Sequence, residues 1–297
     1  MRKIRILTDS CADLTPEMMD RYGIDYGRMN TAYNGEVKIA DLSWTAGEAH
    51  EFYDIIRGGG RITTTQVPPE EFDRVFRKYL DAGEDIIYIS CSNKQSSSIY
   101  TAEKQAEALK SEYPEAEIRC VDSLHASLGE GLIAMKAAEF AAGGKSIDET
   151  VEYTNELIGT TNEFLTVHSL DYLKRAGRVK ASAAFFGNLM GVKPIIIANT
   201  EGDQTPVTKV KGRLNSFKTI VALTKAARIA DNEFADEIYI VHSDCQAAEI
   251  EQLCSLIKEE IGDVKITTAL MGPIIGASCG PDAVSLFVIG KPIQNSI

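Results

Sequence analysis

Residues 86–113 read IIYISCSNKQSSSIYTAEKQAEALKSEY. An apolar run is followed by a loop dense in hydroxyl groups and then by a polar helical segment, which predicts a buried strand that leads into a helix. Two further strand-like runs end in the same way, at the loops TTTQVPPEEF (63–72) and VDSLHASLGEG (121–131). Because open α/β sheets bind ligands in the loops that follow their parallel strands, the repeated pattern predicts a ligand site.

The composition of these loops indicates the kind of ligand. Ser and Thr hydroxyls can bond an anionic head group without adding charge. Backbone N–H groups at the starts of the following helices can supply further donors. The loops therefore predict a small carboxylate or phosphate ligand, and neither a metal nor a cofactor is expected.

Strands and helices alternate through the first half of the chain. Strands are predicted at 3–9, 86–92 and 116–123, and helices are predicted to start at 16, to cover 101–113 and 131–144, and to begin again after 146. Ser146 and Glu149 form a capping box for the last of these helices. This order predicts a three-layer α/β domain with a parallel sheet between two layers of helices.

The second half of the chain changes character. After a strand at 163–169 and a helical region at 172–191, several short strands follow in quick succession. This pattern predicts a two-layer domain with a mixed sheet. For 297 residues we therefore expect two α/β domains, 1–160 and 161–297.

Composition excludes several classes of protein. A net charge of −12 argues against non-specific binding to nucleic acid. No uncharged apolar run approaches the length of a membrane span, and the start of the chain becomes polar too soon for a signal peptide. The six cysteines contain no CxxC pair and have no zinc-finger spacing with histidine. We therefore expect a cytoplasmic protein with reduced thiols.

One short motif suggests an enzyme. GASCG (276–280) matches the G-x-S-x-G nucleophile elbow, in which Asp and His follow the Ser along the chain. No histidine follows Ser278, because the last one is His242. The elbow interpretation is therefore poor, and a tight Gly/Pro turn between strands is the alternative.

Two neighbouring segments allow either a structural or a functional interpretation. The basic residues Lys174, Arg175, Arg178 and Lys180 stand out in an acidic chain. They could form a solvated helix end, or a docking site for a charged partner, for phosphate, or for anionic lipid during a transient membrane contact. The segment 185–191 contains Phe185, Phe186, Leu189 and Met190, which could belong to the core or line an apolar tunnel.

Taken in order, six segments resemble the motifs of the DegV family of bacterial fatty-acid-binding proteins, and the resemblance covers essentially the whole chain. The segments are TDSCADL (8–14), TTQVP (64–68), SNKQSSSIYTA (92–102), VDSLHASLGEG (121–131), LDYLKRAGRV (170–179) and GPIIGASCGPDAV (272–284). The fifth segment is similar to the family's L-x-Y-L-x-R-G-G-R-I, the most specific single motif.

The resemblance implies a function without catalysis by this chain. It implies two α/β domains with a long-chain, palmitate-like fatty acid buried between them. It also implies that Thr64 and Ser96 hold the carboxylate. A separate ATP-dependent fatty acid kinase subunit would then convert the bound acid to acyl phosphate.

The chain departs from the family's motifs at several positions. Ser278 stands where the closing motif usually has His, and QSSS (95–98) replaces L-S-G-T. Two alternatives therefore stay open. One is an enzyme, such as a serine esterase that uses Ser278, and the other is a binder of a different lipid carboxylate.

Overall fold

The first half of the chain forms a parallel sheet. The structure is a computed structural model that describes residues 2–181 and 191–296. Strands β2 (Asp25–Gly27), β1 (Ile4–Asp9), β6 (Asp85–Ser90) and β7 (Ile118–Asp122) lie side by side in that order, and every pair is parallel. Phe185, Phe186, Leu189 and Met190 lie outside the described residues.

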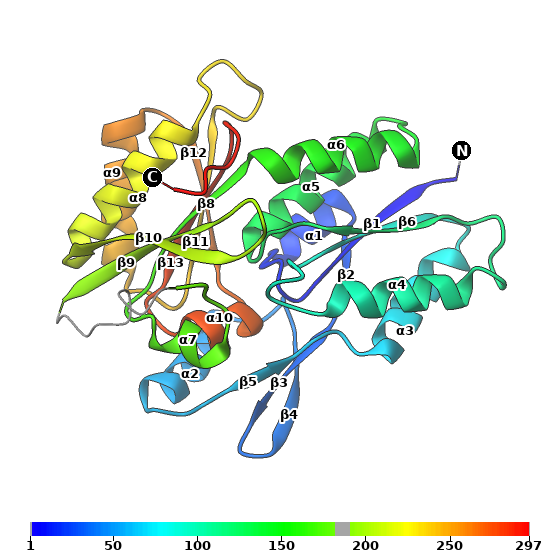
Figure 1. The fold of residues 1–297 in the computed structure, drawn as a ribbon, viewed down its shortest axis with the longest axis horizontal. Helices are drawn as coiled ribbons and strands as arrows, with labels where there is room; N and C mark the ends of the chain where they lie inside the picture. The colour runs from blue at the N-terminus through cyan, green and yellow to red at the C-terminus, as the bar shows by residue number, and fades with distance from the viewer. Residues whose placement is uncertain (1, 182–190, 297) are drawn as a thin grey trace.

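Helices cover both faces of this sheet (Figure 1). Helices α3 (Pro69–Leu80) and α4 (Ser98–Leu109) pack on one face, and α1 (Pro16–Tyr22), α5 (Leu128–Ala142) and α6 (Ile147–Thr160) pack on the other. The side chains of β6 alternate between the two cores, so that Ile86 and Tyr88 face α3 and α4 while Ile87 and Ile89 face α5. The predicted three-layer arrangement is confirmed, as is the capping box of Ser146 and Glu149.

A second, smaller sheet was not predicted. Strands β4 (Glu36–Ala40), β3 (Met29–Tyr33) and β5 (Thr63–Thr65) form an antiparallel sheet, and helix α2 (Ala46–Arg57) lies between β4 and β5 in sequence. Asn34 and Gly35 join β3 to β4 with φ of 51° and 83°. Positive φ at both residues is typical of a two-residue type I′ hairpin, for which Asn-Gly is the preferred sequence. The signal was present in the sequence.

The second half forms a six-stranded mixed sheet. Its strands, in spatial order, are β10 (Gln204–Lys211), β9 (Val192–Ala198), β8 (Thr161–Thr166), β13 (Val284–Ile289), β11 (Glu237–His242) and β12 (Lys265–Leu270). The β11–β12 pair is parallel and the other pairs are antiparallel. Helices α8 (Arg213–Ala227) and α9 (Ala247–Ile261) cover one face. The predicted mixed sheet is confirmed.

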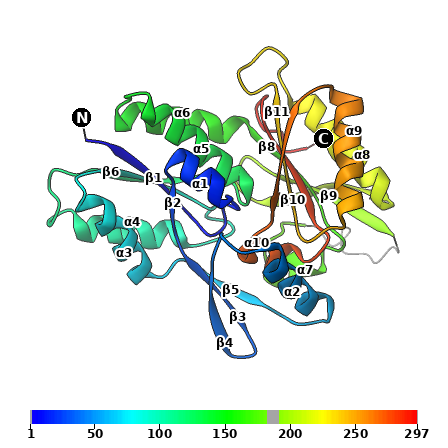
Figure 2. The same ribbon diagram turned by 180° about the vertical axis from the view of Figure 1, so that it is seen from behind.

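The other face of the mixed sheet packs toward the first half of the chain. Leu165 and Phe287 from this face share a hydrophobic core with Leu128 and Leu132 of α5. Figure 2 shows α5 and α6 reaching across to the mixed sheet from behind. The division of the chain at residue 160 remains a prediction, although it coincides with the change of sheet. No helix within 2–181 or 191–296 combines the length and the apolar composition needed to cross a membrane.

Two local predictions were wrong. Within the described part of 172–191, the expected helical region is limited to α7 (Asp171–Ala176), because Gly177 takes a left-handed conformation with φ of 69° and ends the helix; residues 182–190 lie outside the described ranges. The turn expected at 276–280 is instead the end of helix α10 (Pro273–Cys279), which Pro273 starts and Gly280 stops. Gly276 lies inside this helix, where a Cβ atom would collide with the Tyr53 hydroxyl of α2.

Candidate functional site

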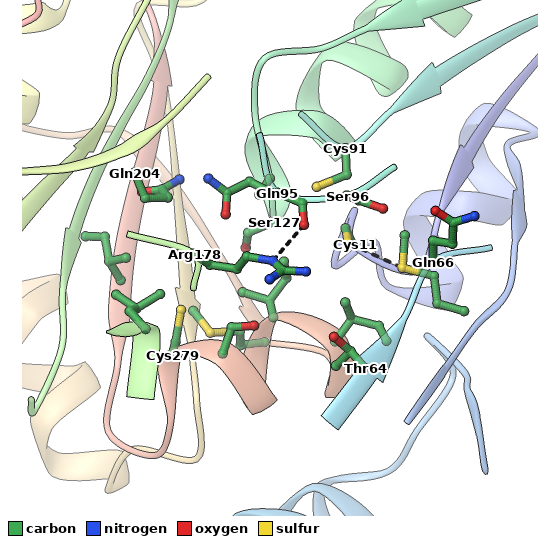
Figure 3. Close-up of a pocket in the computed structure, with 18 of the residues that line it drawn as sticks. Cys11, Thr64, Gln66, Cys91, Gln95, Ser96, Ser127, Arg178, Gln204 and Cys279 are labelled. Carbon is green, nitrogen blue, oxygen red and sulfur yellow. Dashed lines mark hydrogen bonds between the residues drawn. The ribbon is translucent and has the colours of Figure 1, made fainter. Parts of the chain in front are cut away.

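A cavity of about 160 Å³ lies where the loops of the first half meet the mixed sheet (Figure 3). A second cavity of about 180 Å³ adjoins it, and Thr64, Arg178 and Ser278 line both. All three hydroxyl-rich loops contribute to the first cavity. Its lining comprises Cys11, Met29, Thr64, Thr65, Gln66, Cys91, Gln95, Ser96, Ser97, Ala126, Ser127, Glu163, Leu165, Leu173, Arg178, Gln204, Met271, Ile274, Ile275, Ser278 and Cys279.

The structure brings Thr64 and Ser96 to this one cavity. Two of the loops follow parallel strands, as predicted, because they come after β6 and β7. The segment 63–72 was also expected to be a loop after a parallel strand, and this prediction was wrong. Thr64 lies within β5 of the small antiparallel sheet, where it pairs with Thr31. No other residue in the described ranges bonds the Thr64 hydroxyl, so that group is available to a ligand.

Ser96 belongs to a short chain of hydrogen bonds. Val67 N donates to Ser98 Oγ (3.2 Å), the two hydroxyls of Ser98 and Ser96 are 2.9 Å apart, and Ser98 N donates to Ser96 Oγ (3.3 Å). If Ser98 donates its hydroxyl proton to Ser96, the proton of Ser96 is available to a ligand. Ser96 also precedes the N-terminus of α4, where the helix dipole stabilises negative charge.

Arg178 adds a positive charge that the sequence analysis did not assign to the cavity. Its Nε donates to the carbonyl of Gln95 (2.8 Å), the bond drawn in Figure 3, and Nη1 donates to the carbonyl of Ala176. The early end of α7 at Gly177 places Arg178 in an irregular segment beside the cavity. Arg178 is therefore not part of a solvated helix end.

The other basic residues of this stretch have different surroundings. Lys180 forms ion pairs with Glu201 (3.3 Å) and Asp203 (2.9 Å). Arg175 is exposed, and its guanidinium lies 4.8 Å from the centre of the Tyr172 ring. Arg175 also lines the second cavity. Within the basic stretch, Arg175 is therefore an exposed positive charge at the edge of the two cavities.

Buried acids hold the cavity wall in place. Asp9 at the end of β1 accepts hydrogen bonds from the Tyr88 hydroxyl (2.7 Å) and from the backbone N–H groups of Cys11 (2.9 Å) and Cys91 (3.3 Å). These bonds tie the loop after β1 to the loop after β6. Burial raises the pKa of Asp9 and of its neighbour Glu130, which also feels the charge of Asp9. The contacts of Asp9 and Glu130 stabilise the fold, and neither residue lines the cavity.

One buried group could be mistaken for a metal site. The ligand atoms of Cys11, Cys91 and Glu130 lie within 4.8 Å of one another. A hydrogen bond with Cys91, together with burial, raises the pKa of Cys11 well above its usual value. Metal binding needs deprotonated thiols. These thiols therefore suit an apolar wall better than a metal centre.

Ser278 lacks the setting of a nucleophile. It lies in α10 one residue before the helix ends, whereas the elbow places its Ser on the turn between a strand and a helix. None of the described residues that line the two cavities is a histidine. The geometry therefore favours a lining hydroxyl over a catalytic one.

A buried polar pair lines the cavity from the mixed sheet, and the sequence analysis missed it. Gln204 Nε2 donates to Glu163 Oε2 (2.8 Å), and the Ser285 hydroxyl donates to Glu163 Oε1 (2.9 Å). Burial raises the pKa of Glu163 to about 7. The signal was the single acid in the otherwise uncharged strand β8.

Comparison with known proteins gives a consistent result. Residues 3–291 match the family described as "Uncharacterised protein, DegV family". A DegV domain-containing protein of Clostridium perfringens is 33% identical over 295 residues, which cover 98% of each chain. A stearic-acid-binding protein of Eubacterium ventriosum has a similar structure, with a TM-score of 0.85, 22% identity and coverage of 98% of this chain and 99% of that one. A fatty-acid-binding DegV family protein of Thermus thermophilus superposes with a TM-score of 0.84, 24% identity and coverage of 98% and 100%.

Proposed function

The chain belongs to the DegV family, and we propose that it binds a long-chain fatty acid in the cavity between its two halves. In this proposal Thr64 and Ser96 hold the carboxylate. The observation that carries the proposal is one cavity lined both by hydroxyl groups and by apolar side chains. The Eubacterium and Thermus proteins, which have the same fold, are both described as fatty-acid-binding.

A lining that combines hydroxyl groups with apolar side chains suits a fatty acid. The apolar part of the lining comes from Met29, Ala126, Leu165, Leu173, Met271, Ile274 and Ile275. Burial of an acyl chain contributes roughly 0.8 kcal/mol per CH₂, which is on the order of 10 kcal/mol for a long-chain acid. Two neutral hydrogen bonds add about 1–3 kcal/mol together. Affinity should therefore depend on the apolar wall, and orientation on Thr64 and Ser96.

We expect the protein to carry a fatty acid when it is purified from a bacterial host. Mass spectrometry of the denatured sample should detect an acid of long chain length, and the delipidated protein should take up added palmitate. A bound lipid carboxylate of another class, such as a sterol or isoprenoid acid, would replace the proposed ligand. An empty protein that also fails to bind palmitate would contradict the proposal.

We also propose that this carrier is cytoplasmic and presents the carboxylate to a separate ATP-dependent kinase subunit, which forms the acyl phosphate. Arg175 supports this second step, because it is an exposed cation that lines the cavity adjoining Thr64 and Ser278. In a chain with a net charge of −12, such a cation can attract an acidic surface of the kinase.

Replacing Arg175 with Glu should slow acyl phosphate formation several-fold at low salt and less at high salt, because salt screens exposed charges. Arg21→Glu is the matched control, since Arg21 also lies in the last turn of a helix, stacks on a neighbouring tyrosine and precedes a left-handed glycine, but on α1. Fatty acid content should stay unchanged in both variants. Equal rates for Arg175→Glu, Arg21→Glu and the wild type at low salt would exclude Arg175 from kinase docking.

A further inference from the structure

Gln204 lines the cavity and carries a buried, unpartnered polar group. Its side chain is buried, with 6% of the residue exposed, and it lines the cavity. Nε2 donates to Glu163, while Oε1 has no hydrogen-bond partner in the described part of the chain. Buried side-chain polar atoms in proteins are nearly always bonded, so an unpartnered amide group beside a cavity points to a group supplied by the ligand.

The position of Gln204 separates it from the proposed carboxylate site. Gln204 and Thr64 lie on opposite sides of the cavity in Figure 3. Gln204 begins β10 in the second half of the chain, whereas Thr64 and Ser96 belong to the first half. A group that reaches Gln204 therefore differs from the carboxylate held by Thr64 and Ser96.

The neighbours of Gln204 restrict the chemistry of that group. Glu163 is 4% exposed, and its two carboxyl oxygens already bond Gln204 and Ser285. A second carboxylate on the ligand would be repelled by Glu163 when that residue is ionised. A plain methylene chain would leave the amide oxygen without a partner, which is costly for a buried group.

A hydroxyl group meets these conditions. It can donate to Gln204 Oε1 in the orientation described above. If the amide turns over, so that an N–H group faces the cavity, the same hydroxyl can accept. A hydroxyl is also uncharged and small enough to be carried along an acyl chain.

We propose that the cavity prefers a long-chain fatty acid with a hydroxyl group on its chain, which Gln204 binds while Thr64 and Ser96 hold the carboxylate. This inference rests on the proposed function and specifies its ligand class. The distance between Gln204 and the carboxylate site would determine which carbon of the acyl chain carries the hydroxyl group.

The experiment compares stearate with a series of hydroxystearates that carry the hydroxyl at different carbons, using delipidated protein and calorimetry. We expect at least one isomer to bind about tenfold more tightly than stearate. In Gln204→Leu this preference should disappear while stearate binding is retained. Gln66→Leu is the matched control, because Gln66 lines the same cavity but donates to Thr101 (2.8 Å), and it should keep the preference.

The outcomes distinguish this inference from the proposed function. Stearate binding without a preference for any hydroxystearate would overturn the inference and leave fatty acid binding intact. Failure to bind either ligand would contradict the proposed function itself. If Gln204→Leu does not fold, Gln204→Asn keeps the amide but withdraws it by one methylene. A tight isomer that binds Gln204→Asn as well as it binds the wild type would exclude Gln204.

Discussion

Replacing Thr64 and Ser96 together with alanine is expected to weaken palmitate binding by about fivefold to 150-fold. The change removes two neutral hydrogen bonds to the carboxylate, which together contribute about 1–3 kcal/mol. The fold should persist, because Thr64 is half-buried on a short strand and Ser96 lies in the loop before α4. Calorimetry with delipidated protein measures the change in affinity.

The matched control is the neighbouring pair Thr65 and Ser97. These residues have the same types, line the same cavity and are exposed, one residue further along each segment. Thr65→Ala with Ser97→Ala should change affinity less than twofold. If this pair loses the affinity and the Thr64 and Ser96 pair keeps it, the head group is bound one residue further along each loop.

The acyl chain should contribute more to affinity than the carboxylate does. Most of the affinity comes from burial of the chain, so the Thr64 and Ser96 double variant should still bind palmitate measurably. Complete loss of binding with an intact fold would show that the hydroxyl groups contribute far more than neutral hydrogen bonds do.

Local signals explain what could be predicted from the sequence. The alternation of strands and helices in the first half depends on periodicity and caps within one segment, and it was predicted correctly. The Asn34-Gly35 hairpin had an equally local signal and was overlooked. Thr64 and Ser96 were assigned from the resemblance to the DegV family. The strand-end argument applies to Ser96, which follows β6, but not to Thr64, which lies within β5.

Non-local pairing explains what could not be predicted. Glu163 and Gln204 meet because of the strand order β10-β9-β8, in which β9 lies between the strands that carry them. Arg178 reaches the cavity only because α7 ends at Gly177, whereas the helical composition of the following residues favoured a longer helix. The position of Ser278 depends on how α10 packs against α2, where Gly276 contacts Tyr53. These positions follow from tertiary contacts that no single segment specifies.

Glu163→Gln is expected to change how stability depends on pH. Burial raises the pKa of Glu163 from its ordinary value of 4.5 to about 7, so the folded protein holds this proton more tightly than the unfolded chain does. The stability linked to this proton is fully present below pH 4.5 and is lost as the pH rises through 7. The loss between pH 5 and pH 8 is on the order of 2–3 kcal/mol, since one pKa unit corresponds to about 1.4 kcal/mol.

The amide introduced by Glu163→Gln would not titrate, so the variant should lack this loss. It can accept from Ser285, and it can donate to Gln204 once the Gln204 amide turns over to present its oxygen. Urea unfolding of delipidated protein at pH 5 and pH 8 measures the difference, because bound ligand would add its own stabilisation. Glu149→Gln is the control, since hydrogen bonds from Ser146 lower the pKa of Glu149 and any effect lies below pH 4.5. Asp13, whose pKa burial raises to about 7, remains in both proteins and contributes a similar loss to each. Equal pH dependence in Glu163→Gln and the wild type would mean that Glu163 is ionised across this range, and its carboxylate would then require a cationic partner or a wetter cavity than the structure describes.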